Sequence, residues 1–229
     1  MSGKQVSGRL ATTLAFALIC SDSGLHAAGP TPFESEVLAA LNTARQMPAA
    51  LIPVLQAMLP NFHGTMLIRE GRPSLVTLEG APAITAAIEY LQAATPCGAL
   101  QWNDTLAEAA HDHAVDQGVS GETGHGGSDG SLTDQRVRRY GEWRDRLGEN
   151  ITYGAQTPND VALDTIIDDG VTDRGHRNTL MECSYRLVGV ACGEHPRFRR
   201  MCVMVFAAGM NERPALVAPL PNPSPEKGR

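Results

Sequence analysis

The sequence predicts an α+β domain in which helices surround a small antiparallel sheet. Several segments repeat apolar residues at the three- and four-residue spacing of a helix with one buried face. Near the end of the chain two β-rich runs, 187–192 and 201–207, flank a polar loop and predict an antiparallel hairpin. Because the helices are segregated from the strands, the pattern is that of an α+β domain.

The expected helices follow from the spacing of apolar residues and from their end signals. They cover residues 33–45, 49–58, 82–94, 104–117, 135–140 and 161–169. Pro82 opens the third of them, since proline fits the first turn of a helix. Thr157 and Pro158 are an N-cap and a first-position proline ahead of the last helix, and Gly170 is expected to end it.

Outside the helices and the hairpin, the signals are weaker. Short strands are expected at Ser74–Leu78 and Asn150–Tyr153. Residues 118–135 are rich in glycine and serine, which predicts a loop. The proline-rich residues 210–229 have little to bury and are predicted to form a disordered tail, so we expect a single domain over residues 34–209.

The first residues have the pattern of an export signal. Two basic residues precede an apolar run of eleven residues, Leu10–Cys20, which is too short to span a bilayer as a helix. Small residues at Ala27 and beyond suit cleavage there. We therefore predict a signal peptide over residues 1–27, a short linker over 28–33 and a secreted or periplasmic protein without a transmembrane segment after signal removal. A short buried N-terminal helix is the alternative.

Removal of the signal leaves four cysteines, an even number that predicts two disulfides in an exported chain. Cys192 and Cys202 flank the polar loop of the hairpin, so a cross-strand bridge is expected there. That bridge leaves Cys97 to pair with Cys183. A zinc site of four cysteines competes with this pairing, but the sequence has no Cys-x-x-Cys pair.

Two histidines and several carboxylates lie on four short segments, most of them flanked by glycine. His125 lies in Gly-His-Gly-Gly-Ser-Asp-Gly, Glu149 in Gly-Glu-Asn-Ile and His176 in Arg-Gly-His-Arg. Asp168 and Asp169 end a predicted helix. Acids and imidazoles on glycine-rich loops are more typical of a site than of a core. Two neutral imidazoles suit Zn²⁺ or another divalent ion and leave coordination positions open, while carboxylates orient them. The alternative is a polar network in which the histidines only hydrogen-bond the acids and brace the loops.

Other polar residues nearby have less specific patterns. His111 and His113 lie ~200° apart around a helix, so they cannot bind one ion together, and we expect surface and packing roles for them. Ser128 has no Gly-x-Ser-x-Gly elbow around it and is expected to form a turn rather than to act as a nucleophile. Arg136 and Arg177 are expected to pair with the acids.

The order of these motifs resembles the CAP superfamily. That family groups cysteine-rich secretory proteins, venom antigens and plant pathogenesis-related proteins with many bacterial SCP-like extracellular proteins. The similar segments are Leu100–Leu106, the loop of His125, Gly148–Ile151 and Gly175–Arg177, within a match over about residues 34–209. The resemblance implies an α-β-α sandwich with a small central antiparallel sheet. It also implies a cleft where two histidines and two acids converge, often with a divalent metal on the histidines.

The resemblance also implies which residues line the cleft: His125, Glu149, Asp169 and His176. The second acid of the family usually closes a Trp-x-x-Glu helix. That helix falls here at residues 166–169, Ile-Ile-Asp-Asp, which makes Asp169 the counterpart. Isoleucine replaces the tryptophan, and the aspartate is one methylene shorter than a glutamate. Asp168 is therefore the alternative.

These observations favour an exported, non-catalytic CAP-domain protein that binds a ligand, a divalent metal or a partner in its cleft. We expect His125 and His176 to hold zinc or another divalent cation weakly. The partner is expected to be a small ligand, a lipid or a protein, because a net charge of −6 lacks the basic face that nucleic acid needs. One alternative is a metal-assisted hydrolase with Glu149 as the base for a metal-bound water. Another, implied by the resemblance, is a small-lipid or sterol carrier that uses the apolar helices near Ile84 and Leu91.

Overall fold

A computed structural model describes residues 29–211 of the chain. The predicted signal peptide lies outside the described residues. So does the predicted tail, apart from residues 210 and 211, which end the last strand. Within residues 29–211, every helix is too short or too polar to cross a membrane.

The centre of the molecule is a four-stranded sheet with the order β4-β6-β7-β5. Its strands are β4 (Gln101–Trp102), β5 (Glu142–Tyr153), β6 (Leu187–His195) and β7 (Arg199–Asn211). β6 and β7 form the predicted hairpin, and β5 also pairs antiparallel with β7. The short β4 runs parallel to β6 at the edge. β5 is longer than the predicted strand, and its register shifts near Asp145, whose φ is 66°.

The helices lie close to their predicted positions. They are α1 (Pro32–Gln46), α2 (Ile52–Met58), α3 (Ala81–Ala93), α4 (Asp104–Ser120), α5 (Thr133–Tyr140), α6 (Pro158–Ile167) and α7 (Gly175–Leu180). Two 3₁₀ turns, η1 (Pro48–Leu51) and η2 (Leu59–Asn61), flank α2. Thr157 caps α6 as predicted, but that helix ends before Gly170. α7 has no predicted counterpart, because its six residues are too few to show an apolar period.

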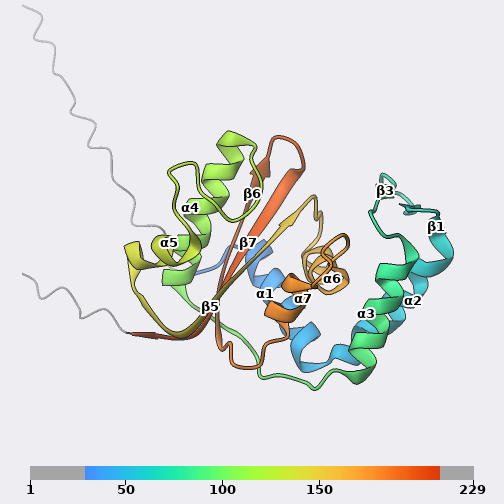
Figure 1. Ribbon diagram of the computed structural model, residues 1–229, viewed down its shortest axis with the longest axis horizontal. Helices are drawn as coiled ribbons and strands as arrows, with labels where there is room; N and C mark the ends of the chain where they lie inside the picture. The colour runs from blue at the N-terminus through green and yellow to red at the C-terminus, as the bar shows by residue number, and fades with distance from the viewer. Residues whose placement is uncertain (1–28, 212–229) are drawn as a thin grey trace, which may run out of the picture.

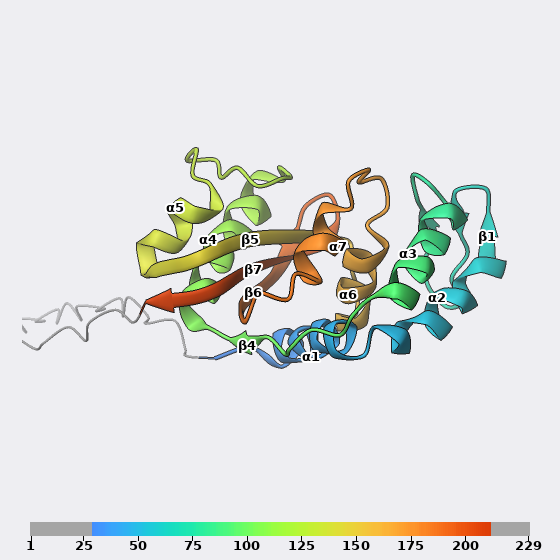
Figure 2. The ribbon, with the colours of Figure 1, turned by 60° about the horizontal axis from the view of Figure 1, so that its bottom comes forward.

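Helices cover both faces of the sheet. Alternate side chains of β7 point to opposite faces, as the pleat of a strand requires. The side chains in the core with α4 and α5 are Met201, Val203, Val205 and Ala207. Those in the core with α1 and α6 are Cys202, Met204 and Phe206. Figures 1 and 2 show α4 and α5 on one side of the sheet and α1 on the other. The predicted α-β-α sandwich is confirmed.

α2, α3 and a second small sheet form a unit that we call the end lobe (residues 52–93). Its strands are β1 (Phe62–His63), β2 (Met66–Leu67) and β3 (Leu75–Val76), which pair antiparallel in that order. The end lobe lies at the end of the molecule away from α5 (Figures 1 and 2). β3 falls within a predicted strand, whereas two-residue strands such as β1 and β2 are too short to carry an alternating pattern.

Ion pairs fasten the end lobe to α6 and to the segment that follows it. Arg72 donates to both carboxylate oxygens of Asp160, at 3.2 and 2.6 Å. Glu79 accepts from both terminal nitrogens of Arg174, each at 2.6 Å. The hydrogen bonds from Arg174 and from the Gly170 amide lower the pKa of Glu79 to about 2. The lobe is therefore held at two separate points.

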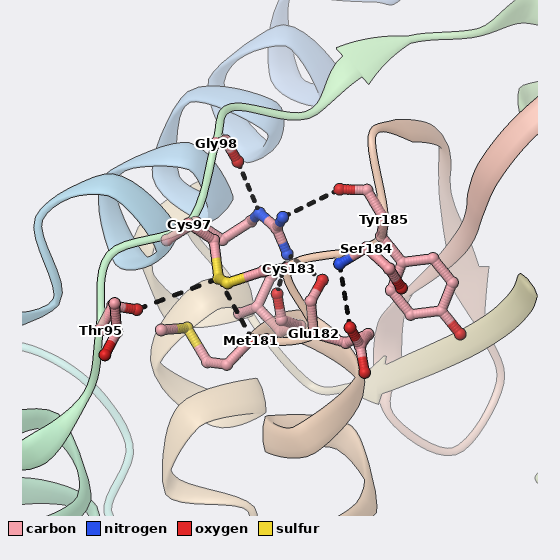
Figure 3. Close-up of a disulfide and its surroundings, with 10 residues drawn as sticks. Thr95, Cys97, Gly98, Met181, Glu182, Cys183, Ser184 and Tyr185 are labelled. Atoms are coloured by element: carbon pink, nitrogen blue, oxygen red, sulfur yellow. Dashed lines mark hydrogen bonds between the residues drawn. A yellow bond between two sulfur atoms is a disulfide. The ribbon is translucent and has the colours of Figure 1, made fainter.

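Both predicted disulfides, Cys97–Cys183 and Cys192–Cys202, are present. Cys192–Cys202 joins residues that lie directly opposite each other in the β6–β7 hairpin. Figure 3 shows that Cys97–Cys183 joins the segment before β4 to the turn after α7. The buried guanidinium of Arg45 lies beside this bridge and donates to backbone carbonyls of both joined segments. Together they hold the end of α7 against α1.

Candidate functional site

His125 lies in the loop between α4 and α5, and it contacts Glu149 in β5. Nδ1 of His125 is 2.8 Å from Oε1 of Glu149. The side chain of His125 is 50% exposed, whereas that of Glu149 is 2% exposed. The imidazole is therefore accessible to solvent while the carboxylate that holds it is buried.

Arg136 of α5 balances the buried charge of Glu149. Its Nη2 donates to both carboxylate oxygens, at 3.1 and 2.9 Å, and its side chain is 1% exposed. Burial raises the pKa of Glu149, but the hydrogen bond with His125 and the charge of Arg136 outweigh it, so the pKa lies below its ordinary value. Glu149 is therefore ionised at neutral pH, and Arg136 pairs with an acid as expected.

Two residues that the sequence did not single out fix the loop of His125. Gln117 of α4 donates to the Gly124 carbonyl at 2.6 Å, and the Tyr153 hydroxyl accepts from the Gly124 amide at 2.9 Å. The same hydroxyl donates to Oε1 of Gln117 at 2.7 Å. His113 is fully buried beside them, in the packing role expected for it. In the sequence, Gln117 could have been recognised as a polar side chain on the otherwise apolar face of α4.

His176 is the second residue of α7, and it contacts Asp168. Its Nδ1 is 2.6 Å from Oδ1 of Asp168, whose side chain is 2% exposed. Oδ2 of Asp168 accepts from the backbone amides of His176 and Arg177, at 2.9 and 3.2 Å. The hydrogen bond to Asp168 raises the pKa of His176 above its ordinary value, although burial opposes the rise. His176 is thus held in the same way as His125.

Asp169, the predicted second acid, occupies a different place. Its carboxylate accepts from two backbone amides of the end lobe, those of Leu78 at 2.6 Å and Glu79 at 2.8 Å. Asp169, expected as the second acid of the cleft, lies near His176 but does not contact it; Asp168 does. The reason is that α6 ends one residue before Asp168, which takes a left-handed φ of 54°. That turn brings Asp168, the alternative left open by the sequence, to the histidine.

The two histidine–carboxylate pairs lie next to each other. The ring centroids of His125 and His176 are 6.3 Å apart. Each Nδ1 contacts a buried carboxylate, and within residues 29–211 no group hydrogen-bonds either Nε2. Metal-binding histidines commonly have such a carboxylate on their second nitrogen. In the described part of the chain, no three His, Cys, Asp or Glu side chains gather as a metal cluster. The site in the described residues is thus two neighbouring imidazoles, each in contact with its own buried carboxylate.

Comparison with known proteins identifies the family. The sequence profile of the CAP family, the cysteine-rich secretory protein family, matches residues 38–206. The chain belongs to the CAP family. An outer surface protein from Borrelia burgdorferi is similar in structure, with 19% identity and a TM-score of 0.42 over 48% of this chain and 78% of that protein. An extracellular protein containing a SCP domain from Bacillus anthracis str. Ames has 20% identity and a TM-score of 0.39, over 48% of this chain and 34% of that one. Comparison with curated protein sequences finds no match.

Several other polar residues of this CAP domain have structural contacts. The Ser128 hydroxyl donates to the carboxylate of Asp116, which supports the turn role expected of this serine. Asn150 donates to the carbonyl of His176 at 2.8 Å and so positions α7. Arg177 was expected to pair with an acid, but its guanidinium donates to backbone carbonyls at the end of α6. It satisfies carbonyls that the helix end leaves unpaired.

Proposed function

We propose that this chain is an exported, non-catalytic CAP-domain protein whose cleft binds a divalent cation through Nε2 of His125 and of His176. The observation that carries the proposal is the pair of buried carboxylates, Glu149 and Asp168, each in contact with Nδ1 of one histidine. A carboxylate in this place keeps the proton on Nδ1 and leaves Nε2 as a metal donor. Zinc suits two imidazoles, with water or a ligand in the remaining positions.

Two features make this binding weak. Two protein ligands are fewer than the three or four of most zinc sites. The raised pKa of His176 also means that a proton competes with the metal for the imidazole. We therefore expect an exchangeable ion, whose open positions accept donor atoms from a small ligand or a protein partner.

The contacts of Glu149 favour binding over hydrolysis. A general base must be free to take a proton from water, and it works best with a pKa near the working pH. The carboxylate of Glu149 instead accepts hydrogen bonds from Arg136 and His125, and its pKa is lowered. This geometry does not support the hydrolase alternative.

The two disulfides support export. Disulfides persist in oxidising compartments such as the periplasm and the extracellular space, and they are rare in the cytosol. Together with the signal peptide predicted for residues 1–27, they lead us to propose a secreted or periplasmic location. Fractionation of cells that express the full chain tests this location. Recovery of the protein from the cytosol, with residues 1–27 still attached and its cysteines reduced, would contradict it.

Zinc titration of the metal-free mature protein tests the cation site. We expect about one zinc ion per chain by calorimetry, and none in the double variant His125→Ala/His176→Ala. His63→Ala, which alters an exposed histidine of β1, is the matched control and should bind zinc as the unaltered chain does. Equal binding by the double variant and the unaltered chain would refute the site. Absence of binding by the unaltered chain would mean that the pairs only brace the loops.

Screening of the same protein against peptides and esters tests its non-catalytic character. We expect the unaltered chain to show no more turnover than Glu149→Gln, because the Glu149 carboxylate is already hydrogen-bonded to Arg136 and His125. Turnover that both Glu149→Gln and chelation abolish would show that the chain is a metal-assisted hydrolase.

A further inference from the structure

A cavity of about 250 Å³ lies between the end lobe and the side of the core formed by α6 and β5, next to His176. Apolar side chains form most of its wall, among them Leu67 and Ile84 from the lobe and Ile151 from β5. Of the two residues near which an apolar carrier site was expected, Ile84 lines this cavity and Leu91 is buried in the core. Most small-molecule sites measure ~300–1,000 Å³, so this one fits a small ligand with an apolar body.

Acidic side chains form the polar part of the wall. Asp168 and Asp169 line the cavity, but their carboxylates already accept hydrogen bonds, from His176 and α7 and from the end lobe. Asp164 of α6 lines the same cavity. Within residues 29–211, its carboxylate accepts no hydrogen bond. Asp164 is thus the acid of this wall that still lacks a donor.

The surroundings of Asp164 give its charge little support. Burial raises the pKa of Asp164 to about 7, and the nearby carboxylate of Asp160 acts in the same direction. Arg69 and Arg72 act against the rise, but Arg72 is itself paired with Asp160. A carboxylate in an apolar cavity without a donor is stabilised by a ligand that brings one.

We propose that the cavity binds a small cationic amphiphile, whose protonated amine contacts Asp164 and whose hydrocarbon chain fills the apolar side. The acids Asp164, Asp168 and Asp169 outnumber the one basic group of the wall, His176. The cavity therefore favours a cation over a fatty acid, whose carboxylate would face like charges. The cavity borders the proposed cation site and shares Asp168 and His176 with it, but the proposed amine contact, Asp164, belongs to the cavity alone.

Exposed apolar side chains lie on and next to β2 and β3, the strands that border the cavity. Val76 and Leu78 are each 76% exposed, and Met66 and Leu75 are also exposed. Val76 and Leu75 line the cavity as well. Exposed apolar residues gathered in one place commonly mark a contact site. Because Leu75 and Val76 are exposed and also line the cavity, they can cover the part of a hydrocarbon chain that is too long for it.

Calorimetric titration of the zinc-free mature chain at pH 8 tests this proposal. The probes are octylamine, octan-1-ol and octanoate, which share one chain and differ in the polar end. We expect octylamine to bind in a single site and octanoate to bind at least about tenfold more weakly, the effect of one hydrogen bond to a charged group. Octyltrimethylammonium carries the same charge without an N–H donor, so it should also bind more weakly than octylamine.

Variants locate the amine. Asp164→Asn should weaken octylamine binding about tenfold or more and leave octan-1-ol little changed. Asp145→Asn makes the same chemical change at an exposed position of β5, and it should leave every affinity unchanged. His125 does not line the cavity, so His125→Ala should bind octylamine normally even where it abolishes zinc binding.

The four probes on the unaltered chain decide the question even if Asp164→Asn fails to fold. Absence of octylamine binding at pH 8 would overturn the proposal. So would octanoate that binds as tightly as octylamine, or an unchanged octylamine affinity in folded Asp164→Asn. Because none of these outcomes involves a metal, failure of the amine pocket is distinct from failure of the cation site.

Discussion

Replacement of Arg136 by methionine should strongly destabilise the fold, because it leaves the carboxylate of Glu149 buried without a cation. Neither side chain is more than 2% exposed. Arg136 also donates to the backbone carbonyls of Ser131 at 2.8 Å and His125 at 3.1 Å, and both of these hydrogen bonds would be lost. Removal of one partner from a buried ion pair costs about 3–5 kcal/mol. Methionine retains much of the apolar stem, so little of this loss would come from a cavity.

Urea unfolding followed by circular dichroism measures this loss. Arg138→Met is the matched control, because Arg138 forms an ion pair with Glu142 in which the side chains are 51% and 58% exposed. Exposed pairs of this kind contribute roughly 0–1 kcal/mol. A double variant, Arg136→Met with Glu149→Gln, should recover part of the loss because no uncompensated charge remains. If Arg136→Met loses no more stability than Arg138→Met, the buried Arg136–Glu149 pair does not stabilise the fold around the loop of His125.

The pH dependence gives a second check on the same pair. The pKa of Glu149 is lower in the folded chain than in the unfolded one, so its ionised form stabilises the fold above the ordinary pKa of a glutamate. That stabilisation is lost as the pH falls through the folded-state value. In Arg136→Met the cation that helps to lower the pKa is gone, so less stability should be lost on acidification than in the unaltered chain.

Three further predictions concern the second acid, the cavity and the disulfides. Asp168→Asn should weaken zinc binding about 10–100-fold, which is the usual effect of removing a carboxylate that contacts a metal-binding histidine. Asp169→Asn should leave zinc binding unchanged. Equal effects of the two variants in calorimetry would show that Asp168 is not the acid that supports His176. Asp164→Asn should raise the free energy of unfolding at pH 8 but not at pH 3, because a raised folded-state pKa destabilises the ionised form; an equal change at both pH values would contradict this. If the disulfides act mainly by constraining the unfolded chain, the longer loop should contribute more to the free energy of unfolding. Loss of Cys97–Cys183, with a sequence separation of 86, should then cost about 4.6 kcal/mol. Loss of Cys192–Cys202, with a separation of 10, should cost about 2.7 kcal/mol. Paired serine variants in urea measure both costs, and a larger loss from the shorter loop would exclude that mechanism.

Features that depend on neighbouring residues were predictable from the sequence. In α1, Val37, Leu41 and Ala44 recur at helical spacing, and all three are fully buried in the structure. The hairpin was predictable for the same reason, because alternating β-rich runs flank a short polar loop. Its register then places Cys192 directly opposite Cys202. The second pair, Cys97 with Cys183, followed once the first had been assigned.

The end lobe depends on contacts between distant parts of the chain, so its form was not predictable. Its strands have two residues each and carry no pattern of their own. Arg72 and Asp160, which hold the lobe against α6, are 88 residues apart in sequence. The cavity beside His176 arises where the lobe meets α6, so it exists only in the folded chain. Asp164 had no motif around it and becomes notable because of that cavity.

The sequence by itself determined the kinds of groups at the candidate site and three of their positions, His125, Glu149 and His176. Only the tertiary structure decided which of two adjacent aspartates, Asp168 or Asp169, meets the second histidine. Two sets of backbone amides, those of α7 and those of the end lobe, each bind one of these neighbouring carboxylates. The left-handed turn that ends α6 sends the two side chains to different amides. A single residue's φ angle is set by these long-range contacts, and no local pattern of residues records it.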